Sequence, residues 1–144
     1  MPRSLDEPLL GGLPLVDVFI DQPQCVRDAL KRNGKSPLSA LRCAALVDSG
    51  SSHSAISSAI VSRFGLRPSN RLTMTTPRGQ STQNIFRVRL SIMMTPSPLV
   101  FDPFNMTEMN WGTLPFEAII GLDILKLGVF TLDGVNGRCK LEMP

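Results

Sequence analysis

The stretch that decides the fold is Ala44-Ala45-Leu46-Val47-Asp48-Ser49-Gly50-Ser51-Ser52-His53-Ser54. Its apolar first part is typical of a buried strand, and this strand runs into a single acid. A carboxylate at the end of a buried strand is costly unless it is hydrogen-bonded, metal-bound or functional. Asp, Ser and Gly are also ordinary turn residues, and Gly50 lets the backbone turn sharply or approach a ligand closely. These residues alone leave two interpretations of Asp48 open, a simple turn and a functional acid.

Length and composition indicate one globular domain. The chain has 144 residues, of which 42% are hydrophobic and 19% charged, so we expect a modest core and no extensive disorder. The net charge of +3 is mildly basic, and the arginines of the middle third are spread out, which is typical of a solvated face. With no Tyr and one Trp, the chain is poorly supplied with stacking groups, so no nucleic-acid partner is expected.

The cysteines Cys25, Cys43 and Cys139 lack the spacing of a metal site or a redox pair. No set of His, Cys and carboxylate residues has ligand spacing either, so we expect neither a metal nor a cofactor. The N-terminus lacks a signal-peptide pattern, and no apolar run is long enough to span a bilayer. Together with reduced thiols, these features predict a cytoplasmic protein without a membrane partner.

Hydrophobic patterns in the first half predict strands followed by a short helix. Residues 15–20 and 41–47 are expected to be strands, separated by a polar insertion at 21–39. A helix is expected directly after the acid, with Ser54 as its N-cap, because apolar residues recur at helical spacing up to Phe64.

The second half is expected to contain two hairpins and a third buried strand. Alternating residues up to Ile92, preceded by the turn Pro77-Arg78-Gly79-Gln80, predict a hairpin with its tip near Gly79. Residues 102–115 are expected to be a long loop, and residues 116–121 a buried strand that ends in glycine. A brief helix and a last hairpin follow.

Two distant motifs together resemble the retroviral type of aspartic protease. Leu46-Val47-Asp48-Ser49-Gly50-Ser51 is similar to the active-site loop of that family, and Ala118-Ile119-Ile120-Gly121-Leu122-Asp123-Ile124-Leu125 is similar to its downstream element. The hairpin tipped by Gly79 lies between them, where the family carries its flap. The order of elements matches over residues 41–143, and it looks most like the short bacterial and retroelement members.

This resemblance implies a mainly β, single-domain retropepsin-like closed barrel with a flap hairpin and one or two short helices. The domain is expected at residues 13–144, after an N-terminal arm at 1–12. The segments 21–39 and 102–115 are insertions relative to a minimal member of the family, so its substrate specificity does not transfer.

The resemblance also implies a reaction, the hydrolysis of peptide bonds by a water held between two carboxylates. Two carboxylates about 3 Å apart cannot both ionise, so the pair shares one proton, as aspartic proteases exemplify. The chain has a single Asp-Ser-Gly, so the second acid is expected to be Asp48 of a twofold-related copy. The expected partners are therefore a second copy, in an obligate homodimer, and a peptide or protein substrate.

The neighbours of Asp48 receive roles from the same resemblance. Ser49 would hydrogen-bond across the dimer beneath the two acids, while Ile120 and Gly121 would brace the loop from behind. The residues expected to contact substrate are Gly50, Ser52, Pro77, Arg78, Gly79 and Gln80.

Other interpretations of the sequence compete with this one. Asp123 is expected to be a structural acid at a helix start, and Asp17 to face solvent. His53 is adjacent in sequence to its serines, whereas a Ser-His-Asp triad needs residues from separate elements. An apyrase-like phosphate loop would lead into the second strand of a hairpin, but the residues after Ser54 have helical spacing. A catalytically inactive dimerisation or peptide-binding module on the same fold stays open.

Overall fold

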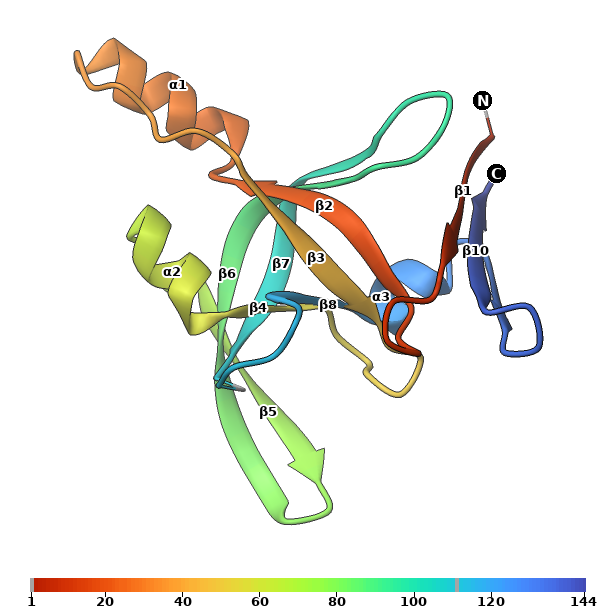
Figure 1. Cartoon of the computed structure of the whole chain (residues 1–144). Coiled ribbons are helices and arrows are strands. Elements are labelled where there is room, and N and C mark those ends of the chain that lie inside the picture. The colour runs from red at the N-terminus through yellow and green to blue at the C-terminus, as the bar shows by residue number, and fades with distance from the viewer. Residues whose placement is uncertain (1, 111) are drawn as a thin grey trace.

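The computed structural model describes residues 2–110 and 112–144, in which strands predominate (Figure 1). The elements are β1 (Arg3–Pro8), β2 (Leu15–Asp21), α1 (Gln24–Arg32), β3 (Leu41–Val47), β4 (Ala55–Ser57), α2 (Ser58–Phe64), β5 (Asn70–Thr76), β6 (Gly79–Ile92), β7 (Leu99–Met109), β8 (Ala118–Ile120), α3 (Leu122–Leu125), β9 (Val129–Asp133) and β10 (Arg138–Met143). The prediction of a mainly β chain is confirmed, and the described residues contain three short helices where one or two were expected.

Six strands close into a ring. They are hydrogen-bonded in the order β2-β3-β8-β4-β7-β6, and β2 also pairs with β6, so the sheet returns on itself. Closure of a sheet protects strand edges that would otherwise be free to pair with other chains. The ring strands share one large group of buried side chains, to which they contribute Val16, Val18, Ile20, Ala45, Val47, Ile56, Phe86, Val88, Leu90, Ile92, Met106, Ala118 and Ile120.

Strand β6 is 14 residues long and takes part in both the ring and a hairpin. Its second half lies in the ring, where Phe86 and Val88 are buried and Arg87 between them is exposed, so the predicted half-buried strand is confirmed. Its first half pairs with β5 in an antiparallel hairpin that projects beyond the ring (Figure 1). At the tip of this hairpin Gly79 has a φ of +113°, a conformation that favours glycine.

Helix α2 begins later than the sequence predicts. Its N-cap is Ser57, whose hydroxyl accepts a hydrogen bond from the backbone N–H of Ile60, and the prediction of Ser54 as the cap is wrong. Strand β4 occupies the positions between, because Ala55 and Ile56 are fully buried against β8 and β7. Pairing with two neighbouring strands therefore outweighs the local helical pattern.

Two segments expected to lack regular structure contain strands. Residues 1–12, expected as an arm, carry β1, which pairs with β10. Residues 102–115, expected as a loop, include the second half of β7, which pairs with β6 and β4, while residue 111 lies outside the described residues. Pro103 concealed this strand, because proline is rare inside sheets, and it lies where the register of β7 against β6 shifts.

A second sheet holds both ends of the described chain (Figure 1). It has three strands in the order β1-β10-β9, and the predicted last hairpin, β9–β10, is confirmed. Leu5 and Leu141 from this sheet are buried in the same core as the ring. By contrast, α1 within the insertion at 21–39 has no buried residue and stands at the periphery (Figure 1).

Candidate active site

Strand β3 places Asp48 at the end of a buried parallel pair. Val47 is aligned with Ile120 of β8, and both side chains are buried. The next backbone N–H, that of Asp48, donates to the carbonyl oxygen of Ile120 over 2.9 Å. The ladder therefore continues to Asp48, whose side chain is half-buried as the chain leaves the sheet.

A tight turn follows and holds the carboxylate. The backbone N–H of Gly50 donates to Asp48 Oδ1 over 2.9 Å, and the N–H of Ser51 donates to the Asp48 carbonyl oxygen over 3.2 Å. A Cβ on Gly50 would lie 3.1 Å from Asp48 Oδ1, which is tighter than ordinary contact. Ser49 and Gly50 themselves are exposed. One carboxylate oxygen is thus oriented by the backbone on an accessible turn.

Gly121 lets the chain after β8 pass directly behind this turn. A Cβ at Gly121 would lie 2.7 Å from the carbonyl oxygen of Ser51 and 2.8 Å from the carbonyl carbon of His53. Atoms at these distances overlap, so any larger residue would displace the loop. The next residue, Leu122, donates its N–H to the Ser51 carbonyl oxygen over 2.8 Å. The two motifs of the sequence therefore lie in contact in the structure.

Ser54 and Asp123 form a second link between the motifs, which was not predicted from the sequence. Asp123 Oδ2 accepts from the N–H of Ser54 over 2.9 Å, and Asp123 Oδ1 accepts from the Ser54 hydroxyl over 2.7 Å. The same hydroxyl accepts from the N–H of Gly121 over 3.0 Å. We call Ser54, Asp123 and Gly121 the loop clasp. Asp123 does lie in the first turn of α3, as expected, but its carboxylate also fixes the far end of the loop.

Two of the serines near His53, Ser51 and Ser54, are engaged with other groups. The Ser51 hydroxyl donates to the backbone carbonyl of His53 over 2.7 Å, and the Ser54 hydroxyl donates to Asp123. This geometry gives no support to a Ser-His-Asp triad. A phosphate-loop hairpin is not supported either, because β4 follows the loop but pairs with β7 and β8 and not with β3.

The hairpin residues expected to contact substrate lie at the β5–β6 tip. Pro77, Arg78, Gly79 and Gln80 are all exposed, and the Thr76 hydroxyl closes the tip by donating to the Gly79 carbonyl oxygen over 2.9 Å. Among the hydrogen bonds of the described residues, none joins this tip to the Asp48 loop. A single chain therefore presents the acid and the hairpin tip as separate features. Ser52, the remaining expected contact, is exposed on the loop.

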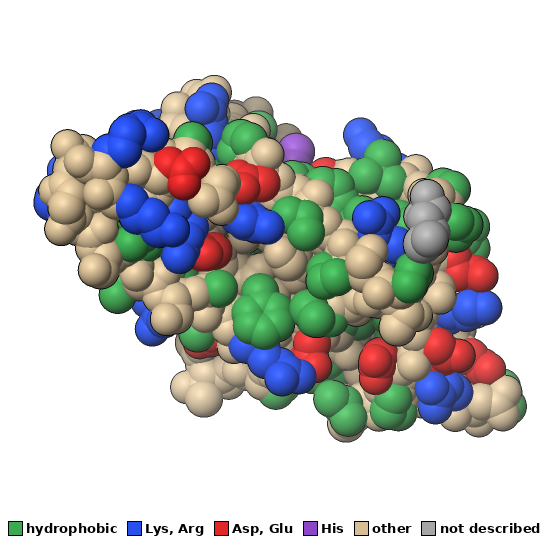
Figure 2. Space-filling view, turned by 90° about the horizontal axis from the view of Figure 1, so that it is seen from above, with side chains coloured by type: hydrophobic (Ala, Val, Ile, Leu, Met, Phe, Trp, Pro, Cys, Tyr) green, Lys and Arg blue, Asp and Glu red, His purple; other side chains and the backbone are tan. Residues whose placement is uncertain are grey.

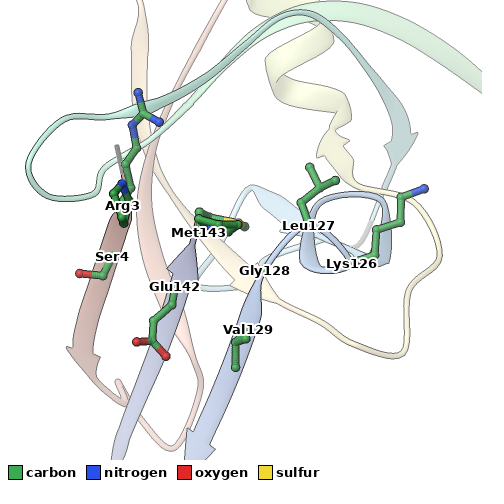
Figure 3. A pocket seen from close by; sticks show the side chains of 10 residues that line it. Arg3, Ser4, Lys126, Leu127, Gly128, Val129, Glu142 and Met143 are labelled. Carbon is green, nitrogen blue, oxygen red and sulfur yellow. The ribbon is translucent and has the colours of Figure 1, made fainter.

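The described residues around Asp48 form no metal-binding cluster. Within residues 2–110 and 112–144, no group of three or more His, Cys, Asp or Glu residues could hold a metal ion. A pocket of about 590 Å³ lies not at Asp48 but between β1, β10 and the turn into β9, where Arg3, Lys126 and Glu142 surround it (Figure 3). None of the helices in the described part is long and apolar enough to cross a bilayer.

Comparisons with known proteins identify the family of the chain and a solved structure of similar fold. The family model described as Retroviral aspartyl protease matches residues 33–134, which is more than half of the chain. A crystal structure of a retropepsin-like aspartic protease from Rickettsia conorii has a similar fold, with a TM-score of 0.61 and 15% identity over 99% of this chain and 92% of that chain. No curated protein sequence matches the chain. The predicted resemblance is confirmed, and the chain belongs to the retroviral aspartyl protease family.

Proposed function

We propose that the chain is an aspartic endopeptidase that acts as a homodimer, with Asp48 from each copy in one active site. The observation that carries the proposal is the presentation of Asp48, half-buried at the end of the β3–β8 pair with Oδ1 held by the Gly50 N–H. The sequence has one such acid loop, so a pair of carboxylates requires a second copy.

In the proposed reaction the two Asp48 carboxylates share one proton and hold a water between them. The ionised acid takes a proton from the water as it attacks the peptide carbonyl, and the protonated acid donates its proton to the carbonyl oxygen. Since one acid must be protonated, cleavage is expected to increase as the pH falls below neutral. Ser49 on the exposed turn would hydrogen-bond across the twofold axis and keep the two loops in register.

Substrate would lie between the Asp48 loops and the β5–β6 hairpins, which would act as flaps. The exposed backbone of Gly50 and the side chain of Ser52 would contact the peptide from the loop side. The tip residues Pro77, Arg78, Gly79 and Gln80 would close over it from the other side. The positive φ of Gly79 supports a sharp tip that can approach a peptide backbone closely.

Cleavage of an unbiased peptide library by the wild type and by Asp48→Asn tests the proposal. Loss of the acid and base function should lower kcat/KM by about 100-fold or more, since proton transfer by positioned side chains contributes that much. Asp17→Asn is a matched control, because Asp17 is an exposed surface acid paired with Arg42 at 2.7 Å. Cleavage that survives Asp48→Asn, or peptide binding by the wild type without turnover, would contradict the proposal.

A further inference from the structure

The two faces of the β5–β6 hairpin carry side chains of different chemistry. The burial pattern of β6 shows which face is which. Within the ring, the even-numbered residues of β6, among them Phe86, Val88 and Leu90, point into the core and are buried. Side chains of a strand alternate between its two sides. The even-numbered residues of the projecting half, Gln80, Thr82 and Asn84, therefore lie on the same face of β6 as the side chains that fill the ring.

Strand β5 completes this face of the hairpin. Residues opposite each other in an antiparallel pair share a face, and the register pairs Thr75 with Gln80, Thr73 with Thr82 and Arg71 with Asn84. We call these residues the polar flap face, and they are Arg71, Thr73, Thr75, Gln80, Thr82 and Asn84. Each of the six carries a hydrogen-bonding group, and all but the half-buried Asn84 are exposed.

The other face of the hairpin is partly apolar. Leu72 and Met74 lie on it, opposite Gln83 and Ser81, and both apolar side chains are half-buried. In the proposed flap the peptide would therefore meet polar side chains, because Leu72 and Met74 lie on the opposite face of the hairpin.

Charge adds a second, independent feature to the polar flap face. Residues 49–101 contain six arginines and no Asp or Glu. Elsewhere arginines such as Arg42 and Arg138 pair with acids, and on the face shown in Figure 2 acidic and basic side chains are interspersed. In the described part of the chain, the side chains of Arg71 and Arg78 on the hairpin have no ion pair with a carboxylate. The hairpin thus offers uncompensated positive charge next to its polar side chains.

We propose that the polar flap face selects substrates whose side chains near the scissile bond are polar or acidic rather than apolar. This inference rests on the proposed function and names its substrate class. An apolar side chain against this face would remove water from hydroxyl and amide groups without replacing their hydrogen bonds, which is unfavourable. A polar side chain replaces those hydrogen bonds, and a carboxylate also meets the guanidinium of Arg71.

Two pairs of variants test the inference in the peptide-library experiment. Thr82→Val keeps the shape of the side chain but removes a hydroxyl from the polar flap face, and it should lower kcat/KM for polar substrates about fivefold. Ser81→Ala removes a hydroxyl from the opposite face and should leave the preference unchanged. Arg71→Gln should lower the preference for Glu over Gln by about two- to fivefold, and less at high salt. Arg87→Gln makes the same charge change on the outward side of β6 and should have no such effect.

Binding to Asp48→Asn gives a readout that does not depend on turnover. Fluorescent peptides that differ by Glu, Gln or Leu near the cleavage site should bind this variant with the same order of preference, and thermal melting should show that each flap variant is folded. Cleavage that depends on Asp48 but prefers apolar side chains, or that responds equally to both members of each pair, would overturn the inference and leave the proposed function intact. Absence of any cleavage dependent on Asp48 would overturn both.

Discussion

At the scale of single residues, the hydroxyl of Ser54 holds the acid loop to α3. It donates to Asp123 and accepts from Gly121, and Ser54 is fully buried. Ser54→Ala leaves the Asp123 carboxylate and the Gly121 N–H without this partner, so we expect the free energy of unfolding to fall by roughly 1–3 kcal/mol. Urea denaturation measures this change. Ser52→Ala, at an exposed position of the same loop, should change it by less than about 0.5 kcal/mol.

A second prediction at the scale of residues concerns Gly121, where steric overlap matters rather than hydrogen bonding. In Gly121→Ala the new methyl group would meet the Ser51 carbonyl oxygen at 2.7 Å, and the loop that carries Asp48 must move. We expect a loss of roughly 1–3 kcal/mol in the free energy of unfolding, with most peptide cleavage lost as well. Gly134→Ala is the matched control, because a Cβ there meets nothing within 4 Å. Equal effects of the two substitutions would contradict the close approach of the motifs.

The residues of the site differ in how far the sequence alone could identify them. Asp48 could be found because an apolar run leads into a lone acid, a local signal. The link between Ser54 and Asp123 could not, because the two lie 69 positions apart and each also fits a local role, as helix cap or helix-start acid. A local sequence pattern cannot identify a hydrogen-bond partner that is distant in the sequence and is brought close only by the fold.

At the scale of elements, the strands that could not be predicted from the sequence are those stabilised by pairing with neighbouring strands. The three residues of β4 lie between β7 and β8, and β7 continues past Pro103 because it pairs with β6. Strand β6 was predictable, since one of its sides is buried and the other exposed, and this leaves a clear alternation in the sequence. Alternation of apolar and polar residues along a strand indicates that one of its sides is buried. The strands that pair with it leave no comparable pattern in its own sequence.

Cys43 on β3 and Cys25 on α1 lie in different environments, which predict the order in which their thiols react. Cys43 lies on β3, where burial, aided by Glu117 and Asp17, raises the pKa of its thiol from 9.0 to about 12. Cys25 is exposed on α1, outside the ring. Since the thiolate is the reactive form, iodoacetamide at about pH 8.5 should modify Cys25 first and Cys43 much more slowly, as mass spectrometry would detect. Equal labelling of the two in the folded protein would show that β3 is open to solvent.

The same pKa shift makes stability depend on pH. The folded state keeps the proton of Cys43 above pH 9.0, where an unfolded thiol loses it, so this contribution to stability is complete below pH 9.0 and is lost as the pH rises toward about 12. Urea denaturation between these pH values should show a smaller decline in the free energy of unfolding for Cys43→Ala than for the wild type. The same decline in both proteins would assign the pH dependence to other groups.

At the scale of the whole molecule, one chain holds half of the proposed site. The ring and the loop clasp fix a single Asp48, while the hairpin tip shares no hydrogen bond with that loop among the described residues. Mixing wild-type chains with Asp48→Asn chains tests whether two copies complete the site. If activity requires Asp48 from both, a mixture at equal amounts that has exchanged subunits should retain about a quarter of the activity of pure wild type, because only one dimer in four has two intact acids. Independent monomers would retain about half, so a linear dependence on the wild-type fraction would contradict the shared site.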